Sequence, residues 1–144
     1  AGFSLSLGSL SINHFKEALK LNPNHYDANV HLGLSLSLKQ NYDEAILHFR
    51  KAIQINPKGP QIYNSLGVAL ANTGKIDEAI AQLKKAIRID PNFAKAHNSL
   101  GVILARSGKI DEGISHLQKA VRLQPNYEEA RKNLKIMQSI KTEH

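Results

Sequence analysis

The sequence contains no cysteine, has few aromatic residues and lacks long apolar runs. The absence of cysteine excludes disulfides and thiolate metal sites. No stretch reaches the roughly 18 apolar residues that a membrane-spanning helix requires, so no span is expected. With 42% apolar and 6% aromatic residues, the 144-residue chain fits one soluble helical domain with a modest core. Its first residue is Ala1 and its one methionine is Met137, which predicts a processed chain or a piece of a longer protein.

Proline marks a period in the chain. Pro23, Pro57, Pro91 and Pro125 are equally spaced, each thirty-four positions after the last, and a pattern of apolar residues recurs with them. A repeat of this length is typical of stacked helical units that bury their faces against one another. The sequence therefore predicts an array that offers a binding surface rather than an active site.

A helix is expected before each proline. Apolar residues lie eleven, eight, five and four positions ahead of it, and these spacings describe one face of an amphipathic helix. The members are Ile12, Phe15, Ala18 and Leu19, then Ile46, Phe49, Ala52 and Ile53, then Ile80, Leu83, Ala86 and Ile87, then Ile114, Leu117, Ala120 and Val121. Because the residue ahead of a proline is disfavoured in helical conformation, each helix is predicted to end there.

A second pattern follows each proline, with leucine, glycine and leucine at nine, ten and thirteen positions after it. The members are Leu32, Gly33 and Leu36, then Leu66, Gly67 and Leu70, then Leu100, Gly101 and Leu104. Gly74 and Gly108 are expected to close these helices in the left-handed conformation, and Gln40-Asn41 to do so less cleanly. The repeated unit is therefore a helix, a tight turn and a second helix.

The glycines in the middle of the first helices require a packing reason. Each costs about 1 kcal/mol relative to alanine in a helix interior. Small residues, namely Ala45, Ala79 and Gly113, stand twelve positions later near the start of the partner helix. We therefore expect the two backbones of each pair to approach closely at the glycine.

The residues that recur at fixed distances from the prolines resemble those of the tetratricopeptide repeat, which has the same period. The residues that carry the resemblance are Leu66-Gly67, Leu70, Ala79, Leu83, Ala86 and Pro91 and their copies. The resemblance implies an all-α, right-handed superhelical solenoid of antiparallel helix pairs with a C-terminal capping helix. The sequence departs from the family six residues after the proline, where Tyr63 keeps the large aromatic but Asn29 and His97 replace it, and at Gly113, where alanine is usual.

The pattern divides the chain into five units. Residues 1–25 are predicted to be a truncated first repeat, mainly its second helix, followed by full repeats at 26–59, 60–93 and 94–127 and by a capping helix and tail at 128–144. The segment Gly2–Leu7 resembles Gly33–Leu38 but lies three positions closer to it than the repeat period requires, which predicts a shortened turn in the first unit. In the last unit Lys135 replaces the repeated glycine, so this helix is expected to be a solvating cap.

A candidate binding face lies on the first helices. In the resembled family these helices line a concave wall that holds peptide ligands, and residues four, seven, eleven and fourteen after each proline share a face. The predicted peptide-binding residues are Asp27, Val30, Leu34, Gln61, Asn64, Val68, Asn72, Lys95, Asn98, Val102 and Arg106. Asn64 and Asn98 either bracket the peptide groups of a ligand or are solvated helix residues. Val30 and Leu34 stand where chaperone-binding members carry lysine and asparagine, so a carboxylate clamp of that kind is not expected.

Nothing in the sequence indicates catalysis, a metal or a cofactor. His14, His48 and His116 recur nine positions before a proline, but neighbouring repeat helices lie about 10 Å apart, too far to share one ion. Surface histidines are therefore expected. No phosphate-binding loop and no nucleophile, base and acid grouping is present, so the chain is not expected to be an enzyme.

The chain carries a net charge of +7, which admits acidic partners. Basic residues gather on the second helices at Arg50-Lys51, Lys84-Lys85, Arg88, Lys119 and Arg122, which the resembled family turns to the convex side. No aromatic residues interleave with them, so a solvated face is expected rather than a nucleic-acid site.

The sequence thus predicts a non-catalytic module that binds a protein or peptide segment in its concave groove. Two alternatives stay open: the substrate-guiding arm of a larger enzyme such as a protein glycosyltransferase, and a basic scaffold for acidic surfaces or nucleic acid. At the N-terminal edge the apolar residues Phe3, Leu5, Leu7, Leu10 and Ile12 are expected to be exposed. Preceding repeats or a second copy would cover them, which predicts self-association through residues 1–20.

Overall fold

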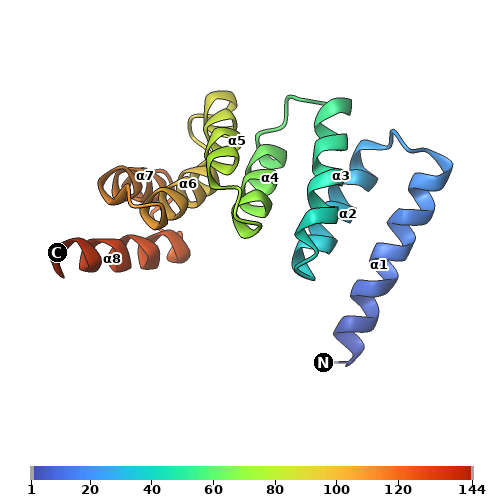
Figure 1. The fold of residues 1–144 in the computed structure, drawn as a ribbon, viewed down its shortest axis with the longest axis horizontal. Coiled ribbons are helices and arrows are strands. Elements are labelled where there is room, and N and C mark those ends of the chain that lie inside the picture. Colours follow the sequence, from blue (N-terminus) through green and yellow to red (C-terminus); the bar gives the residue numbers. More distant parts are fainter. Residues whose placement is uncertain (1, 144) are drawn as a thin grey trace.

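The computed structural model describes the backbone of residues 2–143 and the side chains of residues 11–143, and it is an all-helical repeat solenoid (Figure 1). The helices in this part of the chain are α1 (Gly2–Leu21), α2 (Tyr26–Leu38), α3 (Tyr42–Ile55), α4 (Pro60–Asn72), α5 (Ile76–Ile89), α6 (Ala94–Arg106), α7 (Ile110–Leu123) and α8 (Glu128–Glu143). The predicted fold class is confirmed, and α2–α3, α4–α5 and α6–α7 are the three full helix pairs.

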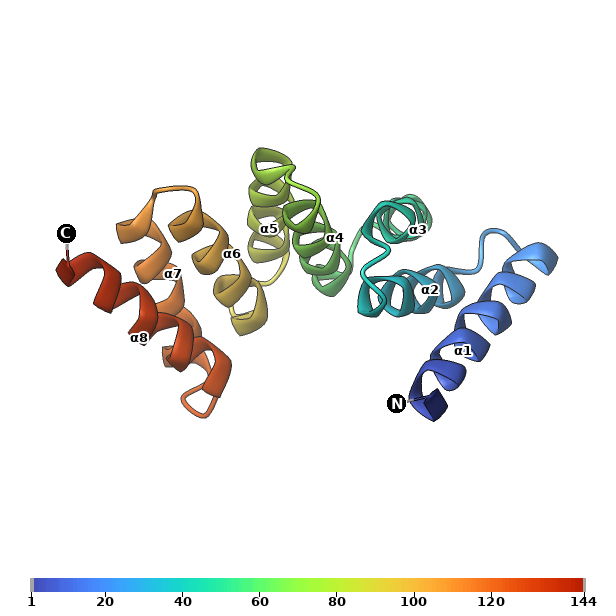
Figure 2. The same cartoon turned by 60° about the horizontal axis from the view of Figure 1, so that its bottom comes forward.

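The array curves with one helix of each pair on its inner side (Figure 2). Helix α2 contacts α4, α4 contacts α6, and α6 contacts α8. Among the described residues, helices α1, α3, α5 and α7 make no comparable contacts with one another. Because elements on the inside of a curve lie closer together, α2, α4, α6 and α8 form the inner, concave face.

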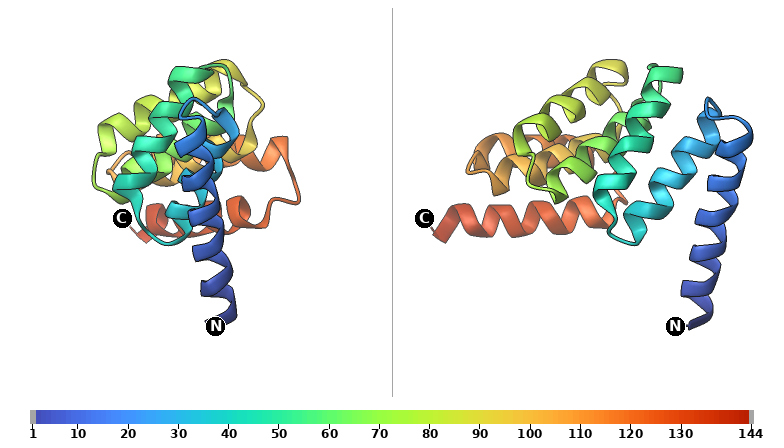
Figure 3. Two further views of the ribbon diagram at one scale, coloured as in Figure 1. Left: turned by 90° about the vertical axis from the view of Figure 1, so that its right-hand side faces the viewer. Right: turned by 45° about the vertical axis from the view of Figure 1, so that its right-hand side comes forward.

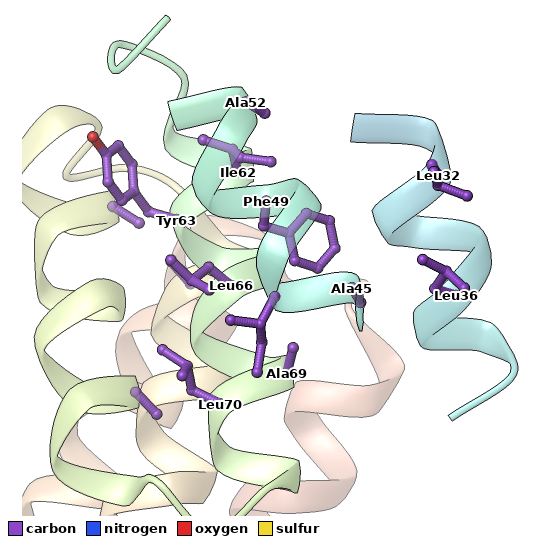
Figure 4. Close-up of a cluster of buried hydrophobic side chains, with 14 of the residues drawn as sticks. Leu32, Leu36, Ala45, Phe49, Ala52, Ile62, Tyr63, Leu66, Ala69 and Leu70 are labelled. Atoms are coloured by element: carbon purple, nitrogen blue, oxygen red, sulfur yellow. The ribbon is translucent and has the colours of Figure 1, made fainter. Parts of the chain in front are cut away.

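The recurring apolar residues form one core cluster that runs from α1 to α6 (Figure 4), and a second one of Leu83, Leu100, Ile103 and Leu104 between α5 and α6. At eight positions before Pro57, Pro91 and Pro125, the side chains of Phe49, Leu83 and Leu117 are 0% exposed, each covered by the first helix of its own pair. The alanines five positions before the proline are equally buried, at Ala52 and Ala86 among others. Interhelical packing of the predicted faces therefore holds each pair together.

Close contact at the repeated glycines is confirmed. A Cβ atom on Gly101 would lie 2.8 Å from the carbonyl oxygen of Gly113, and one on Gly67 would lie 3.2 Å from that of Ala79. At Gly33 the obstacle is different, because the Cβ would meet the ring of Phe49 at 2.5 Å rather than Ala45. In all three pairs a side chain larger than that of glycine would overlap atoms of the partner helix.

The position six residues after each proline has one structural role in spite of its three residue types. Asn29 Nδ2 donates to the carbonyl oxygen of Pro23 at 3.2 Å, and Tyr63 Oη donates to that of Pro57 at 2.9 Å. His97 Nε2 donates to the carbonyl oxygen of Pro91 at 2.9 Å. Each side chain thus ties its helix back to the turn that precedes it.

The turns inside the pairs close as the sequence predicts. Gly74 and Gly108 have φ values of +83° and +96°, and Gln40 occupies the equivalent place with φ of 63°. A residue in the left-handed conformation after the helix allows the next amide to donate a hydrogen bond to a carbonyl in the last turn of the helix. Asn41 N donates in this way to Leu36 O at 2.9 Å. Gln40 adopts this conformation with a Cβ, at a steric cost that glycine avoids.

The N-terminal helix corrects two expectations. The shortened turn expected in the first unit is absent, because residues 2–21 form one uninterrupted helix. Ile12, expected to be exposed, is buried against the core, where Phe15 and Leu19 also pack. The side chains of Phe3, Leu5, Leu7 and Leu10 lie outside the described part. Figure 3 shows the N-terminal turns of α1 extending away from the rest of the array.

The last helix, α8, covers the C-terminal pair. Ala130 is fully buried, and Leu134 and Met137 are partly buried on the same face. At its far end Lys141 Nζ lies 2.6 Å from Asp111 Oδ1 of α7. Lys135 is exposed, as expected for a helix whose outer side is solvated.

Candidate functional site

An apolar stripe crosses the inner face at one position of every inner helix. The residues eleven positions after the four prolines are Leu34, Val68, Val102 and Ile136, on α2, α4, α6 and α8. Leu34 is 40% exposed, Val68 36% and Ile136 44%, whereas Val102 is partly buried. We call these four residues the inner stripe. Its aliphatic surface is available to a partner along the length of the array.

A pocket of about 340 Å³ opens on this face between α4, α6 and α8. Its lining includes Val68, Ala71, Asn72, Ile76, Asn98, Ser99, Val102, Ile103, Arg106, Ser107, Glu129 and Asn133. Aliphatic side chains and amide groups thus line the same pocket, together with the guanidinium group of Arg106 and the carboxylate of Glu129. This combination suits an apolar side chain together with the polar backbone that carries it.

The pocket gathers only part of the predicted binding face. Val68, Asn72, Asn98, Val102 and Arg106 line it. The other predicted residues lie on the first helices outside it, and they are Asp27, Val30, Leu34, Gln61, Asn64 and Lys95.

Residues of α8 were missed by the sequence analysis, although a signal for them existed. Glu129 stands four residues after Pro125, so the rule used for the three full repeats selects it when counting continues into the cap. Asn133 stands eight residues after the same proline, as Ser99 does after Pro91, and both line the pocket. The capping helix is therefore also part of the candidate site.

Asn98 is engaged within the chain. Its Nδ2 donates to the hydroxyl of Tyr127 at 3.3 Å, and its Oδ1 accepts from Asn133 Nδ2 at 3.1 Å. Burial, followed by the negative charge of Glu129, raises the pKa of Tyr127 above its usual value, while the bond from Asn98 opposes this shift. The Asn98 amide thus joins α6 to Tyr127, which directly precedes α8, and to Asn133 of α8.

Asn64 occupies the equivalent place in the preceding repeat without these partners. It is 4% exposed, and its Oδ1 is buried with no hydrogen-bond partner among the described residues. The residues that correspond to Tyr127 and Asn133 are Phe93, which has no hydroxyl, and the shorter Ser99. A buried acceptor without a partner costs about 1–3 kcal/mol.

Two histidines expected on the surface are partly buried instead. The Nδ1 atom of His48 lies 3.1 Å from Asn29 Oδ1, and that of His116 lies 3.1 Å from Nδ1 of His97. Burial lowers the pKa of His48 and of His116, and in His116 the neighbouring His97 lowers it further. These side chains link the two helices of a pair, and His14 alone of the predicted three is exposed.

The basic residues on the outer side are partly engaged in the array itself. Arg50 Nη2 lies 2.6 Å from Glu78 Oε1 of the next pair. The Lys85 ammonium lies 5.0 Å from the ring centroid of Tyr63, within cation–π range. Within the described residues no group of three or more histidine, aspartate or glutamate side chains could hold a metal ion, and no helix there is long and apolar enough to cross a membrane.

Known structures share this architecture. MamA residues 41 to the end from Desulfovibrio magneticus RS-1 is 25% identical, with a TM-score of 0.79 over 86% of this chain and 70% of that one. YrrB, described as a TPR protein with an unusual peptide-binding site, is 23% identical with a TM-score of 0.75 over 96% and 72%. The first TPR of Spaghetti (RPAP3), bound to the HSP90 peptide SRMEEVD, is 20% identical with a TM-score of 0.76 over 81% and 93%. No curated protein matches the sequence significantly.

Family profiles match most of the array. The TPR repeat profile matches residues 36–74 and 69–108, and the Tetratricopeptide repeat profile matches residues 94–127. The first of these covers just over half of the 144 residues, so the chain belongs to the tetratricopeptide repeat family, whose fold typically serves as a non-catalytic scaffold for protein interactions.

Proposed function

We propose that the inner face binds an extended or short helical segment of a partner protein, anchored by an apolar side chain in the pocket between α4, α6 and α8. The inner stripe carries this proposal. Aliphatic side chains at one position of all four inner helices, three of them 36–44% exposed, offer apolar contact along the face. Burying an aliphatic side chain contributes about 1.5–3 kcal/mol when it is fully removed from water, so partial burial of several is enough for measurable affinity.

Polar groups beside the stripe favour a peptide over a purely apolar ligand. Asn64 precedes Val68 by one helical turn, so both residues lie on the same side of α4. Its Oδ1 is buried without a partner, so the side chain would have to turn outward to accept a backbone N–H of the bound segment. Peptide binding by YrrB and by the Spaghetti domain, as their descriptions state, is consistent with this use of the fold.

The experiment starts from peptides selected on the intact chain from a random display library, with affinities then measured by fluorescence anisotropy. Val68→Asp places a carboxylate in the pocket and is expected to weaken binding at least tenfold, about 1.4 kcal/mol. Leu47→Asp makes the same kind of change at a 66% exposed position on α3, outside the pocket, and is expected to leave affinity unchanged. Equal effects of the two substitutions, or none from Val68→Asp, would contradict the assignment.

Asn64→Ala separates binding from folding. Removing a buried acceptor that has no partner is expected to leave stability unchanged or raise it, while peptide affinity falls about fivefold or more. Asn98→Ala is expected to lower stability instead, because it removes both hydrogen bonds to the α8 segment. A loss of peptide affinity in Asn98→Ala without any loss of stability would show that the roles of the two asparagines are the reverse.

A further inference from the structure

The pocket between α4, α6 and α8 contains two charged groups without partners. Arg106 lies in the last turn of α6 and Glu129 in the first turn of α8, and both exposed side chains line the pocket. Neither side chain forms an ion pair or a hydrogen bond with any other residue that the structure describes. A guanidinium group and a carboxylate are therefore both available to a ligand in this pocket.

The two charges lie at opposite ends of the pocket. Asn98 of α6 bonds to the Tyr127 hydroxyl at 3.3 Å and to Asn133 Nδ2 at 3.1 Å. Glu129 stands between these two residues in the sequence and thus belongs to the Asn98 end. Arg106 follows Asn98 by eight residues on the same helix, which at roughly 1.5 Å per residue is a distance of about 12 Å. A ligand that fills the pocket therefore meets a carboxylate at one end and a guanidinium group at the other.

We propose, on the basis of the peptide binding proposed above, that this pocket selects an extended segment in which an apolar anchor is flanked by an acidic side chain at Arg106 and a basic one at Glu129. The anchor meets Val102, which lies four residues from both Asn98 and Arg106 and lines the pocket between them. In an extended chain residues i, i+2 and i+4 point to the same side, and four residues span about 13 Å. The acid and the base are therefore expected four positions apart, with the anchor midway.

Charge complementarity favours this ligand over an uncharged one. A guanidinium group pairs with a carboxylate through two parallel hydrogen bonds, and a carboxylate pairs with a lysine or arginine side chain through charge-assisted hydrogen bonds. Exchanging the two charged side chains of the segment would place like charges together at both ends of the pocket, which is unfavourable. Because the charges of Arg106 and Glu129 cancel, recognition depends on the order of charges in the segment rather than on its net charge.

Charges at helix ends also have a purely structural role, which matched controls separate from binding. Acidic residues in the first turn of a helix and basic residues in the last turn complement the helix dipole wherever they stand. Glu128 shares the first turn of α8 with Glu129, and Arg122 lies in the last turn of α7 as Arg106 does in that of α6. Both control residues are exposed and lie outside the pocket.

Peptide selection from a random display library tests the charge order. The targets are the parent, a swapped variant with Arg106→Glu and Glu129→Lys, and a control variant with Arg122→Glu and Glu128→Lys, all of the same net charge. The parent and the control are expected to enrich an acid and a base in one order around an apolar residue, and the swapped variant in the reverse order. Exchanging the two charges in a parent-selected peptide is expected to weaken its binding to the parent about tenfold or more.

The Val68→Asp variant distinguishes failure of the charge order from failure of the pocket. If it binds the selected peptides as tightly as the parent does, they bind elsewhere and the proposed function itself is wrong. If it weakens binding while the parent enriches no charge pair, or while the swapped variant enriches the parent's order, only the charge proposal is refuted. Reversal in the control variant as well would assign the effect to the helix ends and also refute it.

Discussion

Replacing Gly101 by alanine tests the close approach of α6 and α7 directly. The added Cβ would lie 2.7 Å from Leu117 Cγ, 2.8 Å from the Gly113 carbonyl oxygen and 3.1 Å from the Leu117 amide nitrogen. Ordinary contacts of a methyl group begin at about 3.5 Å. Two of the three obstacles belong to the backbone of α7, so no side-chain rotation removes them and the two helices have to separate.

The expected magnitude is a difference between two opposing terms. Alanine is better than glycine in a helix interior by about 1 kcal/mol, which favours the variant. Inserting a methyl group into a packed interface costs typically about 1–3 kcal/mol. Because the overlap involves backbone atoms, we expect the upper part of this range and a net loss of about 1–2 kcal/mol for Gly101→Ala.

Urea unfolding followed by circular dichroism measures the effect. Ser115→Ala, at an exposed position in the middle of α7, serves as the control because it changes helix propensity without a new contact. We expect the control to unfold at the parent's urea concentration or slightly above it, and Gly101→Ala clearly below it. An unchanged or raised midpoint for Gly101→Ala would mean that the two helices are not in the contact described.

Two further predictions concern turns and protonation. Gln40→Gly is expected to stabilise the chain by about 0.5–1 kcal/mol, since glycine adopts the φ of 63° at this position without steric cost; a lower unfolding midpoint would refute it. Burial lowers the folded-state pKa of His48 and His116, so the unfolded chain binds more protons just below the ordinary histidine pKa, and stability is expected to fall as the pH drops from 7.5 to 5.5. His116→Gln, which copies Gln82 at the same place in the middle pair, is expected to reduce this loss, and an unchanged pH dependence of the urea midpoint would contradict it.

The fold was predictable because burial in a repeat array follows sequence offset. Phe49, Leu83 and Leu117 share one offset from their prolines and one environment, so the constant spacing of the prolines located them without any structure. The same reasoning predicted positive φ at Gly74 and at Gln40. Residues at the same position of successive repeats have the same burial and backbone conformation, so the interior of the array could be predicted from the sequence.

Features that depend on side-chain reach were not predictable in this way. Asn29, Tyr63 and His97 all donate a hydrogen bond to a proline carbonyl oxygen. Because the three side chains differ in chemistry, aligning the repeats does not reveal that they share this role. The partial burial of His116 follows from its contact with His97, which lies 19 residues away on the partner helix. The spacing of residues along one helix does not predict such a contact between side chains of two helices.

The ends of the array were the least predictable part. A turn shortened by three residues leaves too little chain for a left-handed residue and a new helix start, so residues 2–21 keep their backbone hydrogen bonds by continuing as one helix. At the other end the role of α8 as a cap concealed its role in the pocket, where Glu129 and Asn133 contribute. Both differences arise where a repeat has a neighbour on one side only.

The three donors to the proline carbonyls give each repeat its own reporter. Repeats of one array are hard to follow separately, because their backbone signals resemble one another. Here the first full repeat closes its turn with a carboxamide, the second with a phenol and the third with an imidazole, and the protons of these groups resonate in different regions of an NMR spectrum. Hydrogen exchange at Asn29, Tyr63 and His97 can therefore show which repeat opens first without any label or substitution.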